Sequence, residues 1–260
     1  MAKTLKMISA GSIRIEALYN RCTGRETPQQ RAEKRKASSA AQRRMNQIYS
    51  YQQLELRLAA NFPTAGSALV VTLTYDDRHL PKSRKESQIR FKYFLQKLKK
   101  ARQQAGLPDP VVFWTPEILT SESGRWHYHI VLDSTGQDLD MIRACWIYGS
   151  DIDAEKLRVD DDKNHQTLAR YMTKEMRELQ DRCCAPGAHV WFFTRNCWKV
   201  EIETVTVPDD YELEAPEGCE ILIDRQEKTE YASWHHMKLR VGPAALPNAA
   251  KAKRRKRRRC

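Results

Sequence analysis

A short polar link between two strand-like segments is the feature that most limits the folds open to this chain. Residues 111–119 and 126–133 are both rich in β-branched and aromatic residues, which is typical of strands. Only residues 120–125, Thr-Ser-Glu-Ser-Gly-Arg, separate them. Because so short a link joins adjacent strands far more readily than it supports a parallel crossover, the two segments predict an antiparallel hairpin.

The segments around this hairpin predict an α+β fold. A further strand is expected at 69–75, and the spacing of apolar residues predicts helices at 38–61, 86–105, 138–148 and 164–181. The resulting order, β-α-β-β-α, indicates an antiparallel β-sheet flanked by helices, of the ferredoxin-like or RRM-like kind.

Composition divides the chain into four regions. Residues 1–37 are polar and basic, and we expect a flexible arm there. Residues 38–187 are expected to form the main domain, with the helix 38–61 packed on it. Strand-like runs predict that 188–243 is a C-terminal β-rich extension of the same domain. Residues 244–260 are expected to be a disordered basic tail, because so charged a segment cannot bury a core.

The positive charge is concentrated at the two ends of the sequence. The chain has 45 Lys and Arg against 33 Asp and Glu, a net charge of +12. Residues 1–50 hold 11 basic and 3 acidic side chains (+8), and the last ten hold 8 basic and none acidic (+8), which leaves −4 for residues 51–250. Basic ends on a mildly acidic body indicate attraction to a polyanion such as DNA.

Two other classes of protein are disfavoured. No run of 18 apolar residues predicts a membrane-spanning helix, and the first residues lack the apolar core of a secretion signal. The seven cysteines include no Cys-x-x-Cys pair, which argues against a zinc ribbon. We therefore expect a cytoplasmic protein with reduced thiols and no membrane partner.

The segment 124–133, Gly-Arg-Trp-His-Tyr-His-Ile-Val-Leu-Asp, holds the first candidate site. Side chains alternate along a strand, so His127 and His129 share one face and can bind one divalent metal ion. Two hydrogen-bonded histidines on a half-exposed strand are the alternative. If the hairpin turns near residue 122, Glu117 lies opposite His127 and is the first candidate for a third ligand. Glu122 and Asp133 are the other candidates.

The helix at 164–181 supplies the second set of candidates. Tyr171 and Lys174 are three residues apart and share a face. A tyrosine beside a lysine is a plausible nucleophile, because the cation favours the phenolate and balances phosphate charge. The alternative is an ordinary tyrosine at the border of an amphipathic helix, with a solvated lysine.

Basic side chains form a third set. We expect contacts with DNA phosphates from the helix 86–105, from the residue beside the histidine pair and from the tail; the helix face is otherwise an ordinary solvated surface. The residues are Arg90, Lys92, Lys97, Lys99 and Lys100, then Arg125, then Lys253, Arg254 and Arg255.

Three segments in order resemble the three motifs of rolling-circle replication initiators, the HUH endonucleases. They are Leu-Val-Val-Thr-Leu-Thr-Tyr-Asp-Asp-Arg-His-Leu-Pro (69–81), Gly-Arg-Trp-His-Tyr-His-Ile-Val-Leu (124–132) and Leu-Ala-Arg-Tyr-Met-Thr-Lys-Glu (168–175). The resemblance covers about residues 45–200 and is strongest to initiators of bacterial prophages and mobile elements. In that group a stretch similar to 191–198 follows the third motif.

The resemblance implies a role for each candidate. His127 and His129 match the metal-binding motif, Glu117 the upstream acidic ligand, Tyr171 the single nucleophile and Lys174 its companion. It implies an endonuclease that uses Mg²⁺ or Mn²⁺ to nick and join single-stranded DNA at a replication origin through a 5′-phosphotyrosyl intermediate. A separate helicase and polymerase would be partners in the bacterial cytoplasm. The alternatives are a non-catalytic nucleic-acid-binding module on a similar fold and a metal-dependent small-molecule hydrolase.

Overall fold

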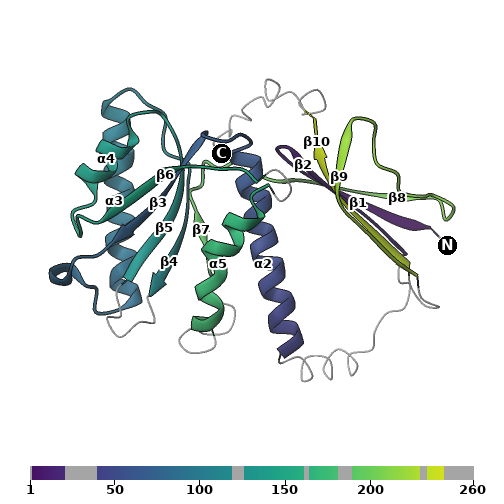
Figure 1. Cartoon of the computed structure of the whole chain (residues 1–260), viewed down its shortest axis with the longest axis horizontal. Helices are drawn as coiled ribbons and strands as arrows, with labels where there is room; N and C mark the ends of the chain where they lie inside the picture. The colour runs from purple at the N-terminus through teal and green to yellow at the C-terminus, as the bar shows by residue number, and fades with distance from the viewer. Residues whose placement is uncertain are drawn as a thin grey trace, which may run out of the picture. The chain divides into compact units, whose positions relative to one another are not determined.

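A computed structural model describes residues 2–20, 40–118, 126–160, 164–180, 189–228 and 233–242. The chain divides into two compact units, each with one five-stranded sheet (Figure 1). The first unit combines residues 1–25 with 200–260, and the second is residues 26–199. No helix among the described residues is long and apolar enough to cross a membrane.

The second unit contains the predicted hairpin. Its strands pair antiparallel in the order β6-β3-β5-β4-β7. Strand β5 is central and lies between β3 and β4. The bounds of the strands are β3 (Ala68–Thr74), β4 (Val112–Ile118), β5 (Trp126–Asp133), β6 (Ile152–Lys156) and β7 (Phe192–Phe193).

Helices cover both faces of this sheet, so the predicted α+β fold is confirmed. Helices α3 (Arg84–Gln104) and α4 (Asp138–Cys145) pack on one face, and α2 (Ala40–Asn61) and α5 (Gln166–Gln180) on the other (Figure 1). A short helix, η1 (Asp77–His79), links β3 to α3. Helix α3 begins after Ser83, whose side-chain oxygen accepts a hydrogen bond from Glu86 N at 3.2 Å.

The alternation along β5 produces two separate cores. Tyr128, Ile130 and Leu132 face α3 and α4, where they pack with Phe91 and Phe94. Val131 faces α2 and α5, and there it packs with Phe113, Leu54, Leu58 and Met172. Each apolar face is therefore closed by its own pair of helices.

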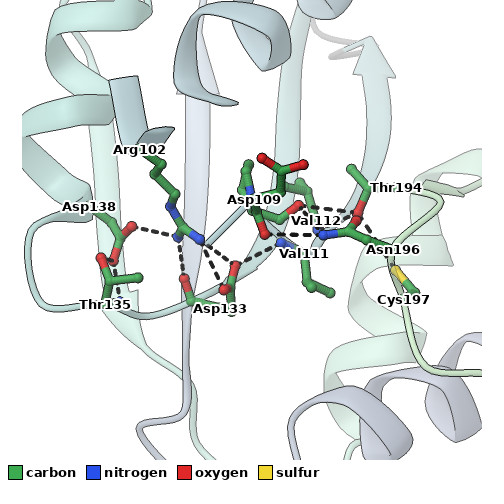
Figure 2. Close-up of polar contacts among 11 residues, drawn as sticks. Arg102, Asp109, Val111, Val112, Asp133, Thr135, Asp138, Thr194, Asn196 and Cys197 are labelled. Carbon is green, nitrogen blue, oxygen red and sulfur yellow. Dashed lines mark hydrogen bonds and ion pairs between the residues drawn. The ribbon is translucent and has the colours of Figure 1, made fainter. Parts of the chain in front are cut away.

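A buried arginine joins α3, β5 and α4 at one end of the sheet (Figure 2). Arg102 is fully buried and donates to both carboxylate oxygens of Asp133 at 2.9 Å and to Asp138 at 2.5 Å. Asp133 also accepts from Val111 N at 2.8 Å. Because its carboxylate oxygens are held by these donors, Asp133 has a structural role and does not serve as the third ligand.

The first unit is an antiparallel sheet in the order β8-β1-β2-β10-β9. Leu5, Leu18, Met237 and Leu239 form its buried core together with Leu213 from a loop. The bounds of the strands are β1 (Lys3–Ala10), β2 (Ile13–Asn20), β8 (Glu201–Val207), β9 (Cys219–Lys228) and β10 (Ser233–Val241).

This unit corrects two of the expected regions. Residues 3–20 of the expected arm are two paired strands, and their flanking partners β8 and β10 lie about 200 residues further along the chain. Partners this distant leave no local signal, which explains the error. The expected extension 188–243 is also divided, since β7 joins the main sheet while β8, β9 and β10 complete the first unit. Residues 21–37 and the tail 244–260 lie outside the described part.

Candidate active site

The two histidines of β5 lie together on the face covered by α2 and α5. Both are buried, at 6% exposure for His127 and 5% for His129. Their ring centroids are 4.9 Å apart and the rings are nearly perpendicular, at 82°. Two imidazoles in this arrangement suit a single shared ion, because an ion about 2.1 Å from each ring nitrogen would separate the rings by roughly this amount.

The register of the hairpin is the predicted one. Glu117 on β4 pairs with His127, and Thr115 pairs with His129. Paired residues share a face, so the backbone gives Glu117 the position that a third ligand requires. Its side chain lies outside the described part, so its role as a ligand stays a prediction.

Two threonines flank His129 on the neighbouring strands. Thr72 on β3 and Thr115 on β4 are its register partners. The Thr72 Oγ1 lies 3.2 Å from His129 Nδ1, within hydrogen-bond distance. A hydrogen bond from Nδ1–H to this oxygen would leave the Nε2 lone pair for an ion, and such a bond also fixes the ring orientation.

The hydroxyl of Thr115 is buried without satisfaction. Thr115 is 1% exposed, and its Oγ1 has no hydrogen-bond partner among the described residues. Buried hydroxyls normally have a partner, because leaving one unsatisfied costs about 1–3 kcal/mol. An orphan oxygen beside the histidines is consistent with a site that receives a polar ligand or water.

Helix α5 brings Tyr171 to the histidines. Ala169 and Met172 bury one side of the helix, and His165 at its start donates from Nε2 to Phe62 O at 2.8 Å. The ring of Tyr171 then lies 4.9 Å from that of His129, centroid to centroid. Tyr171 is nevertheless 54% exposed. It therefore contacts the buried pair and is open to a large substrate.

The donor set fits a divalent cation of the Mg²⁺ or Mn²⁺ type. Two imidazole nitrogens on one face, with a carboxylate residue at the facing register position, resemble the sets that hold octahedral ions with open positions. Among the residues whose side chains are described, no group of three or more His, Cys, Asp or Glu could hold a metal ion. The set therefore depends on Glu117.

The basic residues of α3 are not part of this site. Helix α3 packs on the opposite face of the sheet, through Phe91, Phe94 and Leu98. Arg90 forms an ion pair with Glu86 at 2.5 Å, and Lys99 one with Asp109 at 2.8 Å. These contacts favour the solvated-surface interpretation for two of the five cations.

The other three cations of α3 have lighter contacts. Lys97 lies 4.8 Å from the centroid of the Tyr93 ring, while Lys92 and Lys100 are exposed. Contacts from these residues to DNA stay a prediction, and they would be remote from His127 and His129.

The remaining candidates fall outside the described part. Arg125 and Glu122 lie in the link between β4 and β5, and Lys253, Arg254 and Arg255 lie in the tail. The backbone of Lys174 belongs to α5, but its side chain is not described.

On the reverse face, Tyr128 takes part in a buried chain of hydroxyl groups. Ser87 Oγ lies 2.7 Å from Tyr128 Oη and 3.4 Å from Tyr75 Oη. Burial raises the pKa of Tyr128 and raises that of Tyr75 to about 12, although the hydrogen bond to Ser87 opposes both shifts. These tyrosines stay protonated at neutral pH, which suits structural groups and leaves Tyr171 as the candidate nucleophile.

Residues 68–176 match the family model of the replication-associated protein ORF2. The matched segment contains Glu117, His127, His129, Tyr171 and Lys174. This similarity supports a replication-associated protein of the initiator kind. No curated protein and no solved structure matches the sequence.

Sequence reasoning overlooked the two threonines. Their signal was present in the strand pattern, because Thr72 and Thr74 alternate with Val71 and Leu73 on β3. Polar residues at every second position of a central strand mark a face that is not simply packed. Only the register of β3 with β5 assigns Thr72 to His129.

Proposed function

We propose that this protein is a metal-dependent endonuclease that nicks and joins single-stranded DNA to initiate rolling-circle replication. The observation that carries the proposal is the convergence of His127, His129 and Tyr171, from a central strand and a separate helix. The match of residues 68–176 to replication-associated proteins supports the biological process. The parent element would be a phage, plasmid or other mobile element of a bacterium.

Tyr171 would be the nucleophile. Its phenolic oxygen attacks the scissile phosphorus in line and loses its proton to solvent, while the bond to the 3′ oxygen breaks. The leaving oxygen takes up a proton and becomes a free 3′-hydroxyl, which can prime synthesis. The enzyme keeps the 5′-phosphate as a phosphotyrosine, and attack by another 3′-hydroxyl restores a phosphodiester and joins strands. Exposure of Tyr171 is what a polymeric substrate requires.

His127, His129 and Glu117 would hold the cation, with Thr72 orienting His129. When bound, Mg²⁺ or Mn²⁺ would polarise the scissile phosphate and neutralise its developing charge. Lys174 would favour the phenolate of Tyr171. A separate helicase and polymerase would unwind and copy the DNA.

The test is covalent trapping. The full-length protein is incubated with Mn²⁺ and a 5′-labelled or 3′-labelled single-stranded oligonucleotide from the parent element's origin. We expect strand cleavage and a denaturation-resistant adduct that carries only the 3′-labelled fragment. Tyr171→Phe should abolish both, because it removes one oxygen and keeps the ring packed on His129.

Tyr93→Phe is the matched control, since Tyr93 is an exposed helix tyrosine on the opposite face of the sheet. It should cleave as the native protein does. Cleavage and adduct formation by Tyr171→Phe would disprove the assignment of the nucleophile. Binding without any adduct in the native protein would instead favour the non-catalytic nucleic-acid-binding module.

A further inference from the structure

We propose that an exposed aromatic surface beside β7 binds bases of single-stranded DNA by stacking. This surface, here named the aromatic shelf, consists of Phe193, Trp198 and the guanidinium group of Arg57. The proposal rests on the proposed function and extends it, because it identifies where the substrate is held next to the site of cleavage.

The exposure of the two rings first identifies the shelf. Phe193 is 40% exposed and Trp198 is 59% exposed, although they are only five residues apart. Trp198 has no aromatic ring contact among the described residues, whereas Phe193 stacks on the buried ring of Phe113 at 5.9 Å. Large rings usually contribute their area to a core, so two neighbouring exposed rings indicate a contact surface.

The backbone that carries these rings is firmly held (Figure 2). Thr194 N donates to Val112 O at 2.9 Å, and Val112 N donates to Thr194 Oγ1 at 3.0 Å. Asn196 Nδ2 donates to the carbonyl oxygens of Asp109 and Pro110 at 3.1 and 3.2 Å. The shelf is therefore preorganised, which lowers the entropic cost of binding a ligand.

The main chain of Trp198 is held in the same way. Its N–H donates to Asn61 Oδ1 at 2.8 Å, and its carbonyl accepts from Asn61 Nδ2 at 3.1 Å. This anchor uses only backbone atoms of Trp198. The indole is consequently not needed to fix the segment and is presented to solvent.

The charge beside the rings is positive. The guanidinium carbon of Arg57 lies 4.5 Å from the centroid of Phe193, and Arg57 forms no ion pair within the described part of the chain. Residues 189–199 add exposed Arg195 and Lys199 and contain no acidic residue. Aromatic rings next to unpaired cations are the combination that binds single-stranded nucleic acid, with bases on the rings and phosphates at the cations.

The register places Phe193 on the face of the sheet that carries the histidines. Phe193 pairs with Phe113, which pairs with Val131, and Thr115 pairs with His129 in the next row on that face. Two strand spacings across and two residues along correspond to about 12 Å between the backbones of His129 and Phe193. An extended strand that enters at Tyr171 can therefore reach the shelf within a short stretch of nucleotides.

Binding is measured by fluorescence anisotropy, with a labelled oligothymidylate of about 20 nucleotides and with EDTA present so that metal-dependent cleavage does not occur. Trp198→Ala should raise the Kd by roughly 5- to 150-fold, the effect of losing one stacked base. Trp198→Phe should retain most of the affinity, because it keeps a ring.

The salt dependence separates stacking from charge. The slope of log K against log salt should be unchanged in Trp198→Ala and shallower in a variant with Arg57→Gln and Arg195→Gln. Tyr93→Ala is the matched control, because Tyr93 is 46% exposed and lies beside Lys97 on the opposite face. It should bind as the native protein does.

Two results would overturn the proposal: native affinity in Trp198→Ala, or equal competition by duplex DNA, whose bases cannot stack on a ring. If Trp198→Ala failed to fold by circular dichroism, the native protein and Trp198→Phe decide, since only the native protein should lose indole fluorescence from this site when the oligonucleotide binds. Because the assay needs no cleavage, it fails independently of the Tyr171→Phe experiment.

Discussion

The two faces of the sheet in the second unit have the same strands and opposite characters. On the face covered by α3 and α4, Tyr128 and Ile130 lie in a continuous aromatic and aliphatic core. On the face covered by α2 and α5, the apolar core stops at Val131, and His127 and His129 follow it along the same strand. Strand β5 therefore packs with one set of alternate residues and presents chemical groups with the other.

This difference indicates how a small sheet supports a polar site. A buried pair of imidazoles on a strand gains little stability by itself, because desolvation opposes the burial of polar groups. The opposite face, with its stacked rings of Phe91 and Tyr128 at 4.1 Å and the ion-paired Arg102, stabilises the same strands. We expect substitutions on one face to change stability and those on the other to change activity.

The largest effect is expected on the site face. Replacing His127 and His129 together by alanine should lower the cleavage rate by roughly a thousandfold or more, because it removes the cation that stabilises charge in the transition state. Tyr128→Ala, between them, should instead reduce the free energy of unfolding by about 3–5 kcal/mol through loss of a buried ring. Cleavage assays and urea denaturation of both variants measure the contrast.

The comparison would break if the double histidine variant cleaved normally. It would also break if Tyr128→Ala kept native stability and lost only activity, because the two faces would then not be separate in function.

Next is the buried arginine of the packing face. Arg102→Ala should destabilise the protein by about 3–5 kcal/mol, because Asp138 would keep a buried charge without its partner. Urea denaturation measures the change. Arg143→Ala is the control, since Arg143 pairs with Asp140 at 3.8 Å on the surface and such pairs add little. Equal stability of the two variants would contradict a structural role for Arg102.

The second unit was largely predictable because its contacts are local in sequence. The hairpin β4–β5 and the helices with clear apolar spacing follow from patterns within about 20 residues. The register of Glu117 with His127 followed from the length of the link, and the structure confirms it. The shared face of His127 and His129 needed only the alternation of a strand.

The first unit and the threonines were not predictable for the same reason. Strand β1 pairs with β8, which begins 191 residues after β1 ends, so nothing near Lys3–Ala10 indicates its partner. Thr72 gains its meaning only from the pairing of β3 with β5 across 57 residues. The proximity of Tyr171 to His129 likewise depends on how α5 packs, which spacing within the helix does not determine.

A smaller effect is expected for Thr72, which lies at the edge of the site. Thr72→Val keeps the shape of the side chain and removes the hydroxyl that is 3.2 Å from His129 Nδ1. We expect the affinity for Mn²⁺ to fall about 10- to 100-fold, as for other hydrogen-bond partners of metal-binding histidines, with folding unchanged. Titration of Mn²⁺ by electron paramagnetic resonance measures this without a cleavage assay. Unchanged affinity would remove Thr72 from the site.

The smallest effect tests the packing face by pH. Burial raises the pKa of Tyr75 to about 12, against about 10 in the unfolded chain, so the unfolded state loses this proton first as the pH rises. The stabilisation is fully present below about pH 10 and is lost between about pH 10 and about pH 12. It amounts to about 2 kcal/mol, from about two pKa units.

Tyr75→Phe cannot lose a proton, so its urea midpoint should fall less than that of the native protein over this range of pH. Tyr128, whose pKa is also raised by burial, would still contribute in the variant, so the difference between the two proteins isolates Tyr75. Parallel curves for the two proteins would mean that Tyr75 titrates alike in the folded and unfolded states. The packing face would then be more open to water than its core indicates.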